Sequence, residues 1–129
     1  MTYIPDHEPA LGVRHFPEEA EWTSGFDLAS DADLLIHDAQ YSAGEYPRHV
    51  GWGHSAVSHA MAFAAAANVD RLITFHHDPN RSDAALDRLM AHSLGSSPPA
   101  FRFAAGKEGT HFRLSGHRRS ERPKRTGRA

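Results

Sequence analysis

Cysteine is absent from this chain of 129 residues. Its absence excludes disulfides, thiolate nucleophiles and cysteine-based zinc sites, and it suits a reducing compartment. Long hydrophobic runs are lacking as well, since the longest, around AMAFAAAANV, is about half of the ~20 residues that a membrane span needs. The chain does not open with the charged and then apolar segments of a signal peptide. We therefore expect a soluble, cytoplasmic protein with no membrane partner.

Charge is distributed unevenly along the chain. The composition, 40% hydrophobic and 23% charged, is typical of a globular protein, and the length suits one domain. From His117 onward the sequence has six Lys or Arg residues, one acidic residue and no large apolar side chain. We expect 117–129 to be a disordered basic tail and 1–116 to be an acidic folded unit. Such tails are usually solvated ends, and nucleic-acid binding by this one stays an open alternative.

The hydrophobic pattern alternates between extended and helical periods. It predicts a strand end at 2–4, a short helix near 25–30, a strand at 32–38, a helix at 55–67, a strand at 69–75, a helix at 82–94 and an antiparallel hairpin within 100–114. A strand, a helix and a strand within about 45 residues form a βαβ unit, so the strands at 32–38 and 69–75 should be parallel.

Four residues are expected at the ends of the two longer helices. Ser55 and Ser82 suit the N-caps, because a serine hydroxyl can accept a hydrogen bond from the first turn. Asn68 tolerates the left-handed conformation that closes a helix, and Gly95 is expected to end the second helix.

Both faces of the sheet are apolar in sequence, but these two helices can cover only one. We therefore expect a homodimer through the other face, or poor solubility.

Two histidines follow the strand in RLITFHHDPNRSD, at positions 76 and 77. The Asp78-Pro79 pair after them is ordinary turn chemistry. A histidine at a strand end is a frequent metal ligand or acid–base group, because its neutral nitrogen is available near pH 7. His76 and His77 alone are compatible with either a structural or a chemical role.

The βαβ arrangement brings four polar residues to one edge of the sheet. Asp38 ends one strand, His76 follows the next, and His54 precedes the helix between them. Asp6, after the first strand, should join them, because ligand sites lie at the carboxyl ends of parallel strands. Carboxylate and imidazole groups together suit zinc or manganese. A carboxylate beside a histidine can also orient it for proton transfer.

Four segments, in this order and at these separations, resemble the C-terminal half of metallo-β-lactamase-fold hydrolases: YIPDHEP, ADLLIHDAQY, GWGHS and RLITFHHDP. The closest likeness is to the ribonuclease Z and phosphodiesterase-like branch, over roughly Tyr3 to Leu114. The resemblance implies an α/β fold, half of an αββα sandwich. It also implies a hydrolase with two metal ions, usually zinc, whose bound hydroxide attacks a phosphodiester or a carbonyl carbon.

The resemblance also implies a role for each of the four residues. Asp6 matches the metal-bridging aspartate and His76 matches the last histidine ligand. Asp38 and His54 match the acid and histidine that together deliver a proton to the leaving oxygen. The acid is Asp here, whereas ribonuclease Z relatives have Glu, so its side chain is one methylene shorter.

The family's HxHxDH signature is missing from the sequence, which contains no His-x-His at all. Asp6 and His76 alone would bind zinc weakly. We expect a fragment, a start placed too late, or an N-terminal half on another polypeptide. Two functions follow: a hydrolase of a small phosphodiester that is complete only with the missing half, or a catalytically incomplete remnant that binds a partner.

Several other histidines are expected to have structural roles, and Trp52 has two alternative roles. His77 is expected to be a surface turn residue, and His37 a packed or hydrogen-bonded residue that faces away from Asp38 along the strand. Trp52 is either a lid over the site or part of the loop packing. The other histidines expected to have no special role are His15, His49, His92, His111 and His117.

Overall fold

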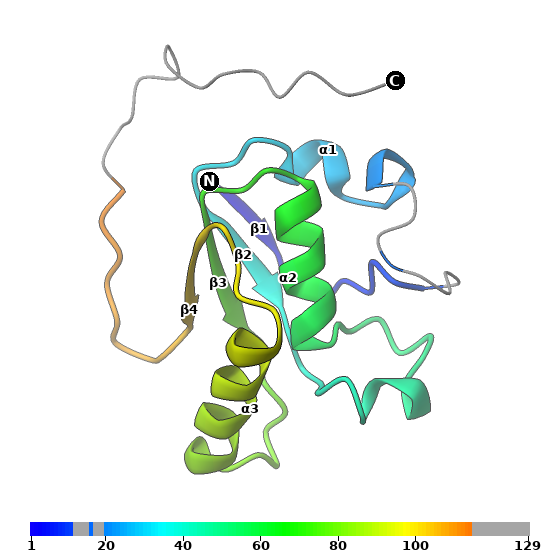
Figure 1. The fold of residues 1–129 in the computed structure, drawn as a ribbon, viewed down its shortest axis with the longest axis vertical. Coiled ribbons are helices and arrows are strands. Elements are labelled where there is room, and N and C mark those ends of the chain that lie inside the picture. The colour runs from blue at the N-terminus through cyan, green and yellow to red at the C-terminus, as the bar shows by residue number, and fades with distance from the viewer. Residues whose placement is uncertain (12–15, 17–19, 115–129) are drawn as a thin grey trace.

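A computed structural model describes residues 1–11, 16 and 20–114, and these contain one four-stranded sheet (Figure 1). The strand order is β1-β2-β3-β4, and all three neighbouring pairs are parallel. The strands are β1 (Thr2–Ile4), β2 (Leu35–Asp38), β3 (Arg71–Phe75) and β4 (Arg102–Ala105). The predicted α/β class and the parallel pairing of the two central strands are confirmed.

Helices fill the connections between consecutive strands. They are α1 (Phe26–Ala29), α2 (Val57–Ala66) and α3 (Asp83–Ser96), with 3-10 turns η1 (Ala20–Trp22) and η2 (Tyr46–Arg48). Each crossover moves to the next strand in the same direction, so right-handed connections place the helices on one face of the sheet. None of these helices, among the residues described, is long and apolar enough to cross a membrane.

The core lies between the sheet and the helices. Leu35 and Leu72 are paired across β2 and β3 and are fully buried. They pack in one cluster with Val57 and Phe63 of α2 and with Met90 of α3. The Ala-rich remainder of α2 adds further buried residues to this cluster, because small side chains allow the helix to approach the sheet closely.

The predicted hairpin within 100–114 is wrong. Its first half is β4, but β4 pairs in parallel with β3, and the described residues after β4 form no strand. The alternation of apolar residues predicts extended backbone, which β4 has, but alternation does not reveal the pairing partner. Because α3 acts as a crossover, β4 completes a second βαβ unit. Gly106 then continues the pairing, with its N–H donating to the Thr74 carbonyl at 2.6 Å.

Two of the four residues predicted at helix ends have the expected role. The Ser82 hydroxyl accepts a hydrogen bond from the Ala85 N–H, and Asn68 has a positive φ of 54°. Ser55 does not cap α2, because its buried hydroxyl instead donates to the His7 carbonyl at 2.6 Å. Gly95 lies inside α3, which continues to Ser96.

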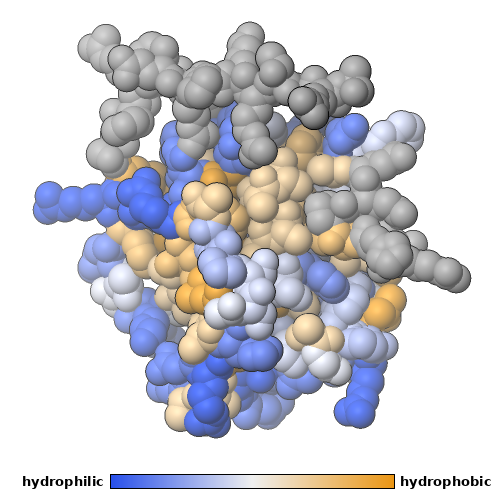
Figure 2. All heavy atoms as spheres, viewed as in Figure 1, coloured by the Kyte–Doolittle hydropathy of each residue, from blue (hydrophilic) through white to orange (hydrophobic). Residues whose placement is uncertain are grey.

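The side of the molecule shown in Figure 2 displays hydrophobic side chains near its centre and hydrophilic ones toward its lower and left edges. The opposite face of the sheet carries the residues that alternate with the core. Among them Tyr3 is 57% exposed, and its ring lies 5.1 Å from the half-buried ring of Phe75. Ile36, between them in the sheet, is also partly exposed. An apolar group remains open to solvent on this face.

We predict that the chain self-associates through the face that carries Tyr3, Ile36 and Phe75. Sedimentation at micromolar concentration should show a dimer, because an exposed apolar patch is stabilised by being covered. Tyr3→Lys should shift the equilibrium toward monomer by placing a charge in the contact. Leu28→Lys is the matched control, since Leu28 is also exposed but lies on α1. A monomer that binds no hydrophobic dye would contradict this prediction.

Candidate functional site

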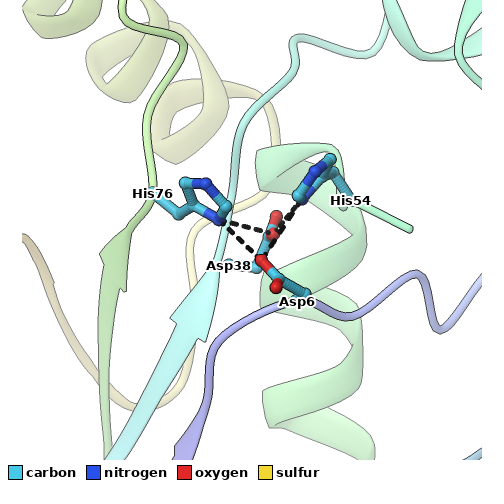
Figure 3. A group of neighbouring side chains, drawn as sticks. All are labelled: Asp6, Asp38, His54 and His76. Carbon is cyan, nitrogen blue, oxygen red and sulfur yellow. Dashed lines mark hydrogen bonds and ion pairs between the residues drawn. The ribbon is translucent and has the colours of Figure 1, made fainter. Parts of the chain in front are cut away.

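The carboxyl ends of β1, β2 and β3 meet at one edge of the sheet, and four polar side chains gather there (Figure 3). Asp6 follows β1, Asp38 ends β2, His76 follows β3 and His54 precedes α2. One oxygen or nitrogen atom of each residue lies within 4.8 Å of the others. The structure therefore brings together the four residues that the sequence predicted for the site.

Asp38 and His54 form a hydrogen-bonded pair. Asp38 is fully buried, and its Oδ2 lies 2.6 Å from His54 Nδ1, while its Oδ1 accepts the Ser55 N–H at 2.9 Å. Because a carboxylate can only accept, the hydrogen of this bond must be on Nδ1. The Nε2 atom of His54 is then the nitrogen that can exchange a proton with another molecule.

Asp6 and His76 form a second, more exposed pair. His76 Nδ1 lies 3.0 Å from Asp6 Oδ1 and 3.3 Å from Asp38 Oδ2. The Asp6 side chain is 66% exposed and that of His76 is 42% exposed, so both can reach a ligand from solvent. His76 also has a positive φ of 56°, a strained conformation of the kind that clusters at functional sites.

The separations of the donor atoms can be compared with the geometry of a metal ion. Two ligands at 2.0–2.2 Å from one tetrahedral zinc lie about 3.3–3.6 Å apart. The Asp6–His76 distance of 3.0 Å lies below this range and is also a hydrogen-bond distance, whereas the His76–Asp38 distance of 3.3 Å lies inside it. The 2.6 Å between Asp38 and His54 is a hydrogen-bond distance and is too short for two ligands of one ion. The oxygen and nitrogen donors of Asp6 and His76 fit zinc or manganese.

A chain of buried histidines lies beside the site. His37 Nδ1 donates to the Asp38 carbonyl at 2.6 Å, which leaves Nε2 to accept from His7 Nδ1 at 2.8 Å. The other ring nitrogen of His7 is 2.9 Å from the Ser24 hydroxyl, and both rings pack against Phe63. Burial lowers the pKa of His37 to about 4 and also lowers the pKa of His7. Both rings are therefore neutral, as this hydrogen-bond chain requires.

Glu8 holds the loop that leads to His54. Its carboxylate accepts hydrogen bonds from the Gly51 N–H, the Gly53 N–H and the Tyr46 hydroxyl, each at 2.8 Å. Burial alone would raise the pKa of Glu8, but these three hydrogen bonds outweigh it, and the pKa is lowered. The residue two positions after Asp6 thus fixes the backbone immediately before His54.

The start of the same loop is tied to the segment before α3. Arg81 Nη2 donates to Glu45 Oε2 at 2.7 Å, and the Ser42 N–H donates to the same oxygen, also at 2.7 Å. Burial would raise the pKa of Glu45, but these donors lower it to about 2. The loop between β2 and α2 is consequently anchored by two carboxylates, Glu8 and Glu45.

Other predicted roles have mixed outcomes. His37 is packed and hydrogen-bonded as expected, with no exposed surface. The prediction that His77 is a surface residue is wrong, because its ring is partly buried near the Ala39 backbone and Arg81, and burial lowers its pKa. His49 stacks on Tyr41, whereas His92 and His111 are exposed. His15, His117 and the predicted tail lie outside the described residues.

Sequence reasoning missed the supporting residues His7 and Glu8. Both follow Asp6 directly, and a run of three ionisable residues after a strand was the one available signal. That signal could not show that Glu8 bonds to Gly51, which lies 43 positions further along the chain. A separation of 30 positions likewise hid the bond between His7 and His37.

A cavity of about 400 Å³ lies between α2, α3 and the loop at 42–44. Its walls are mostly apolar and include Met61, Leu89 and Phe101. None of the four residues of the Asp/His cluster lines it. The cavity is thus separate from the candidate site.

Comparison with known proteins relates the chain to ribonuclease Z, although no family model matches it. It is 35% identical over 71 residues to ribonuclease Z of Prochlorococcus marinus (strain NATL1A), a match that covers 55% of this chain and 23% of the relative. For ribonuclease Z of Thermoplasma volcanium the identity is 36% over 59 residues, covering 46% and 19%. For ribonuclease BN of Citrobacter koseri it is 26% over 96 residues, covering 74% and 32%.

The fold is similar to part of a solved structure, that of the metallo-beta-lactamase fold protein YhfI from Bacillus subtilis. The TM-score is 0.59 at 18% identity, over 84% of this chain and 37% of that one. These likenesses confirm the predicted resemblance to metallo-β-lactamase-fold hydrolases of the ribonuclease Z type. The chain spans less than a third of the length of the ribonuclease relatives described above.

We predict that this chain binds zinc with micromolar or weaker affinity. Asp6 and His76 supply two ligands, whereas catalytic zinc usually has three from the protein. In titration calorimetry His76→Ala should abolish binding, and His54→Ala should retain it. His92→Ala, at an exposed position on α3, is the control. A nanomolar site that His76→Ala abolishes would show that further side chains join these two ligands.

We also predict that acid destabilises the fold through His37. Its folded-state pKa is about 4 and its unfolded value is 6.5, so the unfolded state binds more protons between these limits. Stability is therefore present above pH 6.5 and is lost as the pH falls toward 4. The free energy of unfolding should fall by about 1 kcal/mol per pH unit between pH 6 and pH 5.

Thermal or urea unfolding across this range measures the slope. His37→Gln should make it shallower, because glutamine can still accept the bond from His7 but does not titrate. His92→Gln, at an exposed histidine, should leave it unchanged. A slope that is the same in the parent and in His37→Gln would rule out His37 as the cause.

Proposed function

We propose that this chain supplies a metal-ligand pair and a proton-transfer pair to a metal-dependent hydrolase of phosphodiester bonds. The single observation that supports this most is the division of the Asp/His cluster into two pairs. Asp38 and His54 are 2.6 Å apart and little exposed, whereas Asp6 and His76 are 3.0 Å apart and have more exposed side chains. The relatives named ribonuclease Z support phosphodiester chemistry, and the likeness to a metallo-beta-lactamase fold protein supports a metal-dependent reaction.

Asp6 and His76 would hold the metal ion, zinc or manganese, in this proposal. When bound, the ion supplies Lewis acidity and neutralises negative charge that develops on the phosphate. Asp6 and His76 face solvent at the end of the sheet, so a phosphate group can approach them without displacing the core. The His76 ring lies toward Asp6, with Nδ1 3.0 Å from Asp6 Oδ1.

His54 would deliver a proton to the leaving oxygen. Its Nε2 atom faces away from the bond to Asp38 and can carry that proton. Asp38 holds the ring in one orientation and compensates the charge of the imidazolium form. The aspartate reaches His54 at 2.6 Å, so the side chain that is one methylene shorter than in ribonuclease Z relatives still makes the pair. Ser55 N–H and the neutral His37 ring fix the other side of Asp38.

A small phosphodiester suits the site better than a folded RNA. Residues 1–116 contain fifteen acidic and eight basic residues other than histidine, so they repel an extended polyanion. A small diester brings little charge and can be held by the metal ion alone. Nucleic-acid binding through the basic tail would be abolished by salt, because it rests on neutralising phosphates.

A second candidate is a binding module without turnover. The sequence contains no His-x-His, so the described donors do not complete a two-metal centre. The exposed apolar group with Tyr3 favours contact with another polypeptide. This candidate predicts a stable complex with a partner and no hydrolysis in any combination.

The test is hydrolysis of bis-p-nitrophenyl phosphate with zinc or manganese. The full chain is assayed alone and with a polypeptide that carries an HxHxDH segment. We expect turnover at least in the combined sample. There His54→Ala should lower turnover by roughly 10²–10⁴ without changing metal content, as for a general acid, and His76→Ala should lose metal. His92→Ala is the matched control.

Two results would contradict this proposal. A stable complex with no turnover in any sample would favour the binding module. Loss of metal in His54→Ala would show that the roles of His54 and His76 are assigned wrongly.

A further inference from the structure

A large exposed aromatic side chain lies next to the site. Trp52 is 67% exposed, and only Gly53 separates it from His54 in the sequence. Two residues of chain span at most about 7 Å, so Trp52 and His54 have neighbouring backbone positions. A tryptophan this exposed removes little apolar surface from water in the folded chain. Core packing therefore does not account for it.

The backbone on both sides of Trp52 is fixed. The Gly51 and Gly53 N–H groups both donate to the buried carboxylate of Glu8 at 2.8 Å. Both glycines have positive φ, 87° and 86°, a conformation that other residues rarely adopt. The Trp52 N–H donates to the His49 carbonyl at 3.1 Å. Burying a carboxylate costs free energy unless its oxygens are well bonded. The hydrogen bonds to Glu8 therefore hold the loop rigidly in place.

Aromatic rings connect Trp52 to the proton-transfer pair. The Trp52 ring contacts His49 edge-on at 4.9 Å, and His49 stacks on Tyr41 at 4.3 Å with 13° between the planes. Tyr41 in turn meets His54 edge-on at 6.2 Å. The line of rings runs from solvent to His54. A planar group placed against Trp52 would therefore lie beside the site and not on a remote surface.

We propose that Trp52 is a specificity-determining residue that stacks on the planar nucleobase or aryl group carried by the phosphate ester. This rests on the proposed phosphodiester hydrolysis and names its substrate class: diesters with an aromatic group, in preference to alkyl diesters. An indole has an exposed π face, and stacking on it tolerates any planar base. Glu8 is a positioning residue that acts through the Gly51 and Gly53 amides.

Binding can be tested without turnover. Trp22→Phe leaves Trp52 as the one tryptophan, since the sequence contains two. Its fluorescence is titrated, with zinc present, with adenosine 5′-monophosphate and with ribose 5-phosphate, which lacks the base. We expect adenosine 5′-monophosphate to quench the fluorescence with a dissociation constant roughly tenfold lower than that of ribose 5-phosphate, because only the base stacks. Equal responses, or none, would overturn the inference.

A second test measures KM and kcat in the sample that hydrolyses diesters. Trp52→Ala should raise KM roughly tenfold for bis-p-nitrophenyl phosphate and leave KM for dimethyl phosphate and kcat for both unchanged. Trp52→Phe should restore most of the affinity, and Trp22→Ala is the matched control. Equal KM values for the parent and Trp52→Ala would contradict stacking while the hydrolase proposal stands.

The two proposals fail in different ways. If no diester is hydrolysed, the proposed function is wrong, and the fluorescence titration still decides whether Trp52 binds a base. If Trp52→Ala changes sedimentation but not ligand binding, Trp52 is a contact between polypeptides, and the inference falls.

Discussion

The site depends on the hydrogen bonds that hold the buried carboxylate of Asp38. It has no exposed surface, and its two oxygens accept from the His54 ring and the Ser55 N–H. A buried charge is tolerated only when it is bonded in this way, so the end of β2 and the start of α2 must stay together. The Asp38 carbonyl in turn receives the bond from His37. Displacing Asp38 would disturb His54, the loop before it and the buried histidines together.

The parallel sheet could be predicted in large part from the sequence, because two of its signals are local. An unbroken apolar run marks each central strand, and a βαβ connection allows one pairing direction. The segment 100–114, which contains β4, has a pattern that predicts an antiparallel hairpin. Its real partner is β3, and that pairing depends on where α3 returns the chain. Sequence alternation contains no information about that position.

The four residues of the candidate site were also predictable, since each stands where a strand ends or a helix begins. Their support was not. Glu8 accepts hydrogen bonds from the backbone N–H groups of Gly51 and Gly53. Almost every residue has such a donor, so the sequence does not show which ones a carboxylate will bind. Ser55 was expected to cap α2, but its hydroxyl bonds to His7 across the sheet edge. Contacts between distant segments decided both cases, and they also determine how rigidly His54 and Trp52 are held.

In the proposed hydrolase one cluster contains two pairs with different tasks. The most direct test is a crystal structure of the protein soaked in millimolar zinc, with anomalous data collected at the zinc absorption edge. We expect zinc in contact with Asp6 and His76, and an intact hydrogen bond between His54 and Asp38. Zinc bound between Asp38 and His54, with that hydrogen bond broken, would contradict this division of roles.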